Sequence, residues 1–300
     1  MEMRDRSLRV SAVILTHNRA GEVLNTVRHM AALPEKPHLV VVDNGSADGT
    51  PERIAESFPA VTLLRLPENI GAAARNAGVR SVKTPYVAFC DDDTIWAPGS
   101  LARASEILDA WPGIAVLTAH VLVGVRQRED PACTMMEASP LPSTGLPGKA
   151  VLGFLAGACV FRRDAFLESG GYEPKFLIGG EEALLAIDIV ARGHVIVYSR
   201  ELTVHHYPST RRNAAARQRQ TLRNALWVAW LRRPLGSALA CTADILARAD
   251  STHDALSGLT HALRGLPWVL RKRRVIPPRV EALCTMLEHW QRAQWPLRPL

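Results

Sequence analysis

Residues 86–93 have the sequence YVAFCDDD, a short apolar run that ends in three consecutive carboxylates. The composition and length of the run predict a buried strand. Three adjacent anions at its end repel one another. A divalent cation with a phosphate-bearing ligand would offset that repulsion, because hard cations take oxygen ligands. The alternative is a solvated acidic turn, but the surrounding chain favours a metal site.

The chain around this run alternates between apolar, strand-like runs and helical stretches. Strands are expected at residues 8–16, 38–43, 61–66, 86–90, 114–123 and 194–198, and helices at 20–33, 52–57, 71–82, 98–111 and 181–192. This alternation predicts βαβ units and an α/β fold with a mostly parallel sheet flanked by helices.

Polar clusters follow three of the expected strands, at residues 16–19 (THNR), 43–44 (DN) and 91–93 (DDD). Ligands of parallel sheets bind beyond the carboxyl ends of the strands. One polar strand end is routine, whereas three together predict a binding site at that edge of the sheet.

Two later stretches have distinct compositions. Residues 126–149 are rich in Pro, Ser and Gly, which predicts a long loop that could act as a lid over the site. Residues 151–161 (VLGFLAGACVF) predict a strand, and its glycines would let the backbone approach a ligand closely.

The net charge of +7 is unevenly distributed. Residues 211–300 hold 16 Lys and Arg against 5 Asp and Glu, whereas residues 1–210 hold 20 against 24. Together with a change to helical patterning after Pro208, this asymmetry predicts a domain at 1–210 and a basic helical region at 211–300. Five tryptophans lie in that region, at positions 227, 230, 268, 290 and 295. A basic region of this kind can contact an anionic membrane surface or an anionic substrate.

Five scattered cysteines without a CxxC pair argue against a disulfide framework or a zinc site and favour the reducing cytoplasm. No apolar run is long enough to predict a transmembrane helix, and the charged N-terminus does not predict a signal peptide. We therefore expect a cytoplasmic protein, with peripheral association at the inner face of the cell membrane through the basic region.

Five motifs together resemble the family 2 glycosyltransferases, which have the GT-A fold. They are VILTHNR (13–19), VVDNGSADGT (41–50), NIGAAARNAG (69–78), DDD (91–93) and GGYEPKFLIGGEE (170–182). The resemblance is to members of the bacterial rhamnosyltransferase type and spans roughly residues 8–210, with a further recurring element of bacterial members at Arg223-Asn224. It implies an inverting transfer of a sugar from a nucleotide diphosphate sugar to an acceptor hydroxyl. The acceptor would be a glycan, a lipid-linked molecule or a small molecule.

For the nucleotide, the candidate ligands are Thr16, Asn18, Arg19, Asp43, Asn69, Arg75 and Asp91. Asp43 can accept hydrogen bonds from a nucleobase that Thr16 and Arg19 frame, since arginine stacks on aromatic rings. An Asx turn is the alternative role for Asp43. Arg75 is a candidate partner of a phosphate or of Asp91, or a member of a surface ion pair.

For the metal, the resemblance implies that the last acid of the DxD pair holds Mg²⁺ or Mn²⁺. We assign Asp93 to the metal and Asp91 to the ribose and to supporting metal contacts, since alternate residues of an extended segment share a face. A histidine at residue 205 or 206 would complete the metal site. Only one of the two should face it, and His205 is favoured.

For the base, the resemblance implies the second acid of the pair at 181–182, which is Glu182 where the family usually has Asp. Glu181 stays open as the alternative, and so does a structural role, because acids are common at helix starts. The family's further acid two positions after the base is Leu184 here, so no role transfers to it.

Several other functions are weighed against this assignment. A dehydrogenase would need GxGxxG after the first strand, where this chain has His17-Asn18-Arg19-Ala20-Gly21. A sugar nucleotidyltransferase and a non-catalytic glycosyltransferase-like binding protein are the main alternatives. Nucleic acid is not expected as a partner.

Overall fold

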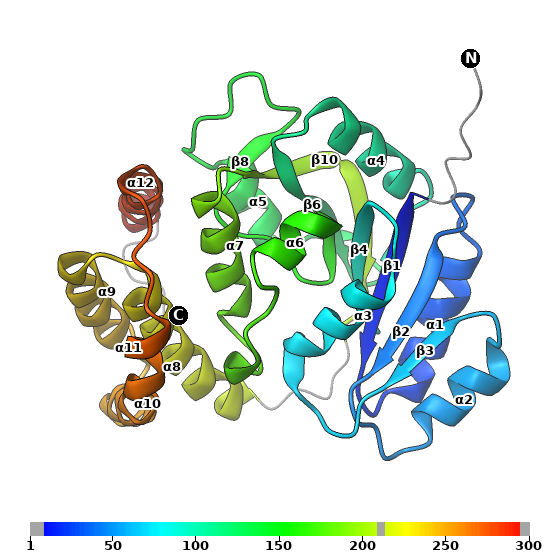
Figure 1. Cartoon of the computed structure of the whole chain (residues 1–300), viewed down its shortest axis with the longest axis horizontal. Coiled ribbons are helices and arrows are strands. Elements are labelled where there is room, and N and C mark those ends of the chain that lie inside the picture. Colours follow the sequence, from blue (N-terminus) through cyan, green and yellow to red (C-terminus); the bar gives the residue numbers. More distant parts are fainter. Residues whose placement is uncertain (1–8, 209–213, 295–300) are drawn as a thin grey trace.

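The structure is a computed structural model that describes residues 9–208 and 214–294 (Figure 1). Its strands are β1 (Val10–Thr16), β2 (His38–Asp43), β3 (Thr62–Arg65), β4 (Tyr86–Asp91), β5 (Thr94–Trp96), β6 (Ile114–Val123), β7 (Arg128–Glu129), β8 (Lys149–Val151), β9 (Ala158–Arg162) and β10 (Val195–His206). Its α-helices are α1 (Ala20–Ala31), α2 (Thr50–Ser57), α3 (Arg75–Ser81), α4 (Ser100–Ala110), α5 (Pro131–Glu137), α6 (Arg163–Glu168), α7 (Glu181–Ala191), α8 (Ala214–Arg232), α9 (Leu235–Ala247), α10 (Thr252–Arg264), α11 (Leu266–Lys272) and α12 (Pro278–Gln294). Short 3₁₀ turns, η2 (Gly71–Ala74) and η3 (Pro174–Phe176), precede α3 and α7.

The described strands form one mixed sheet with the order β3-β2-β1-β4-β9-β6-β10-β5. The half formed by β3, β2, β1 and β4 is parallel, as the βαβ pattern predicts. Strand β9 is antiparallel to both β4 and β6 and so separates this half from the parallel pair β6–β10. The short strands β5, β7 and β8 add antiparallel edges.

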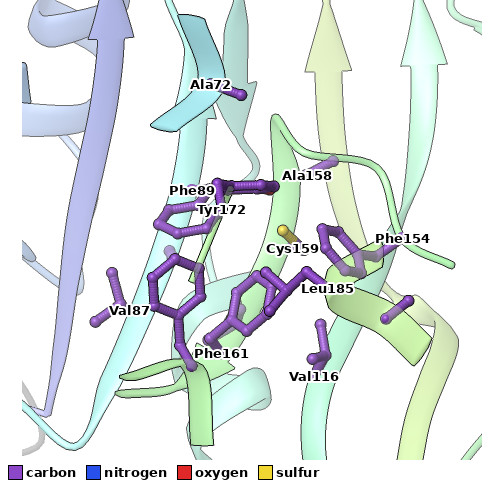
Figure 2. Close-up of a cluster of buried hydrophobic side chains, with 14 of the residues drawn as sticks. Ala72, Val87, Phe89, Val116, Phe154, Ala158, Cys159, Phe161, Tyr172 and Leu185 are labelled. Carbon is purple, nitrogen blue, oxygen red and sulfur yellow. The ribbon is translucent and has the colours of Figure 1, made fainter. Parts of the chain in front are cut away.

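An aromatic cluster fills the core where β4 and β9 meet the helices behind them (Figure 2). The ring of Phe89 lies 5.1 Å from that of Phe161, and Phe166 packs edge-on against both. Tyr172 lies 5.8 Å from Phe166, which links the cluster to the chain that leads into α7. Large aromatic side chains supply much buried apolar area, so this cluster fixes β4 and its acidic end relative to α7.

Residues 126–149 are not a single loop, contrary to expectation, because they contain β7 and α5. The α5 helix begins at Pro131, and the Asp130 side chain caps it by accepting from the amide of Ala132. Residues 151–161 are likewise not one strand. They leave β8 after Val151 and enter β9 at Ala158.

The C-terminal helices α8–α12 lie beside α7, on the opposite side of the molecule from β2 and β3 (Figure 1). Helix α8 is central, because α9, α10 and α11 pack against it and its Leu222, Leu226 and Trp227 are buried. None of the helices in the described ranges is both long enough and apolar enough to cross a membrane. Trp295 and Arg211 lie outside the described residues.

Candidate functional site

An open cavity of about 730 Å³ lies beyond the carboxyl ends of β1, β2 and β4. The parallel register pairs Thr16 with Asp43 and Leu15 with Asp91, so these strand ends share one edge of the sheet. The cavity is lined by eight of the residues proposed from the sequence: Thr16, Arg19, Asn69, Arg75, Asp91, Asp93, Glu181 and Glu182.

Asp91 is held between a buried cation and a glycine. Its carboxylate pairs with Arg75, whose guanidinium lies 5.7 Å from the ring centre of Phe89 and 6.0 Å from that of Tyr172. Burial alone would lower the pKa of Arg75, but the charge of Asp91 and the smaller effects of neighbouring groups together outweigh it, and the pKa is raised. Opposite, a Cβ at Gly157 would lie 2.5 Å from Oδ2 of Asp91. We expected Arg75 to pair with a phosphate, with Asp91 or in a surface ion pair, and the structure shows the ion pair with Asp91.

Asp92 and Asp93 lie in the turn after β4, so strand alternation does not govern them and all three acids line the cavity. Thr16 Oγ1 donates to Asp92 Oδ2 at 3.0 Å, and Arg19 Nη1 donates to Asp92 Oδ1 at 2.9 Å. Burial raises the pKa of Asp92 to about 7, Arg19 opposes this, and the charge of Asp93 adds to it. Arg19 also contacts Asp93 Oδ2 at 3.3 Å. Thr16 and Arg19, which we expected to frame a nucleobase, here hold the acidic turn.

His206, not His205, faces the acids. Nε2 of His206 lies 3.5 Å from Oδ1 of Asp93, and His206 lines the cavity. The expectation that His205 faces this site is wrong. Its Nδ1 contacts Oε1 of Gln127, and it lines a separate cavity of about 420 Å³ between α1, β5 and the end of β10.

Asn44, which we did not propose, organises the loop beside the cavity. Its Nδ2 donates to Asn69 Oδ1 at 2.9 Å, and its Oδ1 accepts from the amide of Ile70 at 3.0 Å. Asn69 Oδ1 also accepts from the amide of Gly71 at 2.9 Å. These amide contacts fix residues 69–71 at the cavity wall.

Asn18 and Asp43 lie next to the cavity without lining it. Asn18 Oδ1 accepts from the amide of Ala47 at 2.8 Å, and the Asn18 amide donates to Ser46 Oγ. Oδ2 of Asp43 accepts from the amide of Ser46 at 3.2 Å, so Asp43 has the alternative role of stabilising the turn. Its Oδ1 is buried and has no hydrogen-bond partner within the described part of the chain. That oxygen is therefore a ready acceptor for an N–H donor.

Glu181 and Glu182 are the first two residues of α7 and both line the cavity. Gly180 precedes them with a φ of +85°, a conformation that favours glycine. Glu181 is buried, only 3% exposed, whereas Glu182 is half-buried. Glu182 and Arg75 line the same cavity, and the charge of Glu182 adds a small contribution to the raised pKa of Arg75.

The described residues, 9–208 and 214–294, contain no cluster of three or more His, Cys, Asp or Glu side chains arranged to hold a metal. A Mg²⁺ ion at a nucleotide site commonly takes one or two protein ligands and completes its shell with phosphate and water. Asp93 and His206 supply one oxygen and one nitrogen donor on the cavity wall. They fit a cation shared with a phosphate ligand.

Some residues that line or support the cavity were not proposed from the sequence, and they differ in whether a sequence signal could have identified them. Asn44 and Asp92 adjoin proposed residues in the same motifs, so the sequence indicates that they lie near the site. It does not indicate which groups they contact. Gln220 on α8 also lines the cavity, and no local pattern marks it, because its segment returns to the site from a distant part of the chain.

Comparison with known proteins identifies the family. The sequence model of glycosyl transferase family 2 matches residues 11–169, more than half of the chain. The chain is 24% identical over 245 residues to the N-acetylglucosaminyl-diphospho-decaprenol L-rhamnosyltransferase of Mycobacterium tuberculosis (strain ATCC 25618 / H37Rv), covering 68% of this chain and 78% of that protein. It is 29% identical over 160 residues to succinoglycan biosynthesis protein ExoO of Rhizobium meliloti (strain 1021), covering 52% and 44%.

Two solved structures are similar in fold. One is mannosyltransferase PcManGT from Pyrobaculum calidifontis in complex with GDP-Man and Mn²⁺, with a TM-score of 0.57, 20% identity, and coverage of 96% of this chain and 87% of that one. The other is GalNAc-T7 with UDP, GalNAc and Mn²⁺, with a TM-score of 0.65, 16% identity, and coverage of 97% and 58%. They confirm the predicted GT-A fold class. The chain belongs to glycosyl transferase family 2 and is a glycosyltransferase.

Proposed function

We propose that this glycosyltransferase moves a sugar from a nucleotide diphosphate sugar to an acceptor hydroxyl with inversion at the anomeric carbon. The observation that carries the proposal is the convergence of the acidic turn, His206 and the Glu181–Glu182 pair on one cavity. Reaction of a sugar diphosphate needs a neutraliser for the leaving group and a base for the attacking hydroxyl. In this cavity the acidic turn and His206 could bind a cation that neutralises the leaving group, and the Glu181–Glu182 pair could supply the base.

The nucleotide would lie along the carboxyl ends of β1, β2 and β4. Oδ1 of Asp43 would accept an N–H of the base; the support is that this buried oxygen lacks a partner within the described residues. The loop that Asn44 fixes would approach the nucleotide, and Asp91, held by Arg75, would accept from the ribose hydroxyls.

Asp93 and His206 would hold Mg²⁺ or Mn²⁺. Such a cation supplies Lewis-acid stabilisation of the negative charge on a diphosphate leaving group. The structures of two similar proteins were solved with Mn²⁺, which supports this assignment. Arg19 holds Asp92 and Asp93 in the turn at 2.9 and 3.3 Å, and so keeps the carboxylates turned toward the cavity.

Glu182 would act as the general base. The acceptor hydroxyl loses its proton to the Glu182 carboxylate as its oxygen bonds to the anomeric carbon. The bond from that carbon to the diphosphate oxygen breaks, and its electron pair leaves with the nucleoside diphosphate. A single displacement from the opposite face inverts the anomeric centre. We favour Glu182 over Glu181 because it is the more accessible of the two.

We propose a lipid-linked acceptor in the biosynthesis of cell-envelope polysaccharide. The support is the similarity to the mycobacterial rhamnosyltransferase, whose name specifies a diphospho-decaprenol acceptor. The enzyme would work in the cytoplasm, at the inner face of the membrane, where the basic C-terminal region would contact anionic lipid.

Turnover of a panel of nucleotide sugars in the presence of Mn²⁺ tests the proposal. Asp93→Ala should abolish turnover, and EDTA should do the same to the wild type. Glu182→Gln should lower kcat and leave donor binding by calorimetry intact. If Glu181→Gln loses turnover while Glu182→Gln keeps it, the base is Glu181. Wild-type enzyme that neither binds nor turns over any nucleotide sugar contradicts the proposal.

A further inference from the structure

The segment just before the two glutamates adopts a strained turn. Leu177 has φ +61° and ψ −67°, and the Ile178 amide donates to the Phe176 carbonyl at 2.7 Å. This is a γ-turn with positive φ, a rare conformation for a residue that carries a Cβ. Strained backbone persists only when surrounding contacts hold it, and it collects near functional sites.

Asn224 of helix α8 supplies such contacts. Its side chain is fully buried, and its Nδ2 donates to the carbonyls of Phe176 at 2.9 Å and Ile178 at 3.1 Å, and also to that of Gly179. One amide group therefore joins both sides of the γ-turn to α8.

Arg223 fixes the orientation of that amide. Its Nε and Nη2 donate to Asn224 Oδ1 at 2.9 and 2.8 Å. Because a guanidinium can only donate, the oxygen of Asn224 must face Arg223 and the NH₂ must face the carbonyls. The guanidinium lies 4.4 Å from the ring centre of Trp227, which anchors it on α8.

The opposite side of the turn contacts the nucleotide side of the cavity. The Leu177 carbonyl accepts from the Ala72 amide at 2.8 Å. Gly71 approaches so closely that a Cβ there would lie 1.8 Å from the same carbonyl oxygen. The turn is thus held between η2 and α8, and the two glutamates follow it directly.

We propose that Asn224 is a positioning residue for the transfer reaction. It holds residues 176–180 so that the Glu181–Glu182 pair faces the acceptor, and α8 is thereby part of the active site. Gln220, one turn earlier on the same helix, lines the cavity beside the pair and supports this assignment. The inference rests on the proposed role of Glu182 as base.

The test compares Asn224→Asp and Asn224→Ala with the wild type. Asn224→Asp keeps the shape of the side chain and can pair with Arg223, but it replaces the donors to the three carbonyls with an oxygen that repels them. Asn224→Ala removes the donors without that repulsion. We expect kcat to fall about 10- to 100-fold in both variants, as misplacement of a catalytic group by about 1 Å does. The dissociation constant of the donor should change less than kcat, since Asn224 bonds to residues 176, 178 and 179 and reaches the nucleotide side only through the contact of Leu177 with Ala72.

Hydrogen exchange provides a readout besides activity. The amides of Ile178 and Leu184 should exchange faster in both variants, because their carbonyl acceptors belong to residues 176–180. The matched control is Thr242→Val on α9. It removes the acceptor of the indole N–H of Trp230, which lies on α8 like Asn224, at 2.9 Å, and it does not alter the turn. It should leave kcat and these amides unchanged.

The outcomes separate the two proposals. Wild-type enzyme without turnover of any nucleotide sugar contradicts the proposed function, and the exchange experiment still tests the contact made by Asn224. An active wild type with unaltered kcat and exchange in both Asn224 variants overturns the positioning role alone. Equal losses of kcat in Thr242→Val and Asn224→Asp also overturn it, because general weakening of α8 would then explain both.

Discussion

Gly157 shows how a residue without a side chain can shape the site. It faces Asp91 so closely that a Cβ would lie 2.5 Å from the carboxylate oxygen. Gly157→Ala should therefore displace Asp91 from Arg75 and weaken donor binding about tenfold or more, equivalent to ~1.4 kcal/mol. Calorimetric titration with the donor measures this. In the same segment a Cβ at Gly153 would meet nothing within 4 Å, so Gly153→Ala is the matched control and should bind normally. Equal affinity in both variants would refute the steric argument.

The two adjacent histidines allow a second comparison between single residues. His206 lies 3.5 Å from Asp93, whereas His205 faces a different cavity. His206→Ala should raise the Mn²⁺ concentration needed for half-maximal turnover, because it removes a nitrogen donor from the cation. His205→Ala should leave that concentration unchanged. A metal dependence that shifts only in His205→Ala would contradict the assignment.

The sequence alone predicts that one of the two histidines faces the site, but it does not determine whether this is His205 or His206. Strand alternation implies that adjacent residues face opposite sides, and His205 and His206 do so. The register of β10 against β6, however, shifts between Ser199 and Thr203, which resets the faces along the strand. That irregularity depends on tertiary pairing. The position of the three acids, by contrast, could be predicted, because Asp91, Asp92 and Asp93 directly follow the apolar run of a strand in the sequence.

Among the elements, β1, β2, β4 and β6 match their apolar runs closely, whereas β10 (Val195–His206) extends well beyond the expected strand at 194–198. The helix at α5 was missed, although Asp130-Pro131 is a start signal that local chemistry explains, since Asp caps the helix and Pro suits its first turn. The orientation of β9 had no comparable signal. The apolar pattern of a buried strand does not indicate its direction relative to neighbouring strands. Whether β9 pairs parallel or antiparallel therefore depends on the path of the whole chain.

The contact between α8 and α12 predicts a pH dependence. Arg233, the residue after the end of α8, bonds to Glu281 on α12 at 2.6 and 2.9 Å, and both side chains are largely buried. Burial would raise the pKa of Glu281, but the hydrogen bonds from Arg233 and Ser237 together with the charge of Arg233 outweigh it, and the pKa is lowered. A lowered folded-state pKa means that the stabilisation is present at neutral pH and is lost as the pH falls below the ordinary value of 4.5.

Glu281→Ala should accordingly lower the free energy of unfolding by about 1.5–3 kcal/mol at pH 7, as loss of hydrogen bonds to a charged group does. The difference from the wild type should shrink at pH 4. Urea denaturation at the two pH values measures it. Glu52→Ala is the control, because its pair with Arg65 is exposed and should contribute only about 0–1 kcal/mol. A difference that is the same at both pH values would contradict the ion pair as the source of the stability.

At the scale of the whole molecule, the C-terminal region carries four consecutive cations, residues 271–274, in one surface segment. We name the α11 patch as residues 270–275, where Leu270 and Val275 are 57% and 53% exposed and Arg271, Lys272 and Arg274 are also exposed. Exposed apolar side chains flanking cations suit the interface of an anionic membrane, which each Lys or Arg near the surface attracts by about 1 kcal/mol. Arg273 differs, because it donates to the carbonyls of Trp230 and Arg233.

Replacing the three exposed cations with glutamine should therefore weaken binding to vesicles that contain phosphatidylserine by ~3 kcal/mol, about 100-fold. Leaving Arg273 in place keeps α11 attached to α8, so the variant should retain its fold and its turnover of soluble acceptors. Co-sedimentation with phosphatidylserine vesicles, compared with phosphatidylcholine vesicles and repeated at high salt, isolates the electrostatic part, because salt screens exposed charges. Equal binding of the wild type to both kinds of vesicle would show that the basic surface does not recognise lipid charge. The basic residues of the C-terminal region would then either contact the acceptor itself or be solvated without an anionic partner.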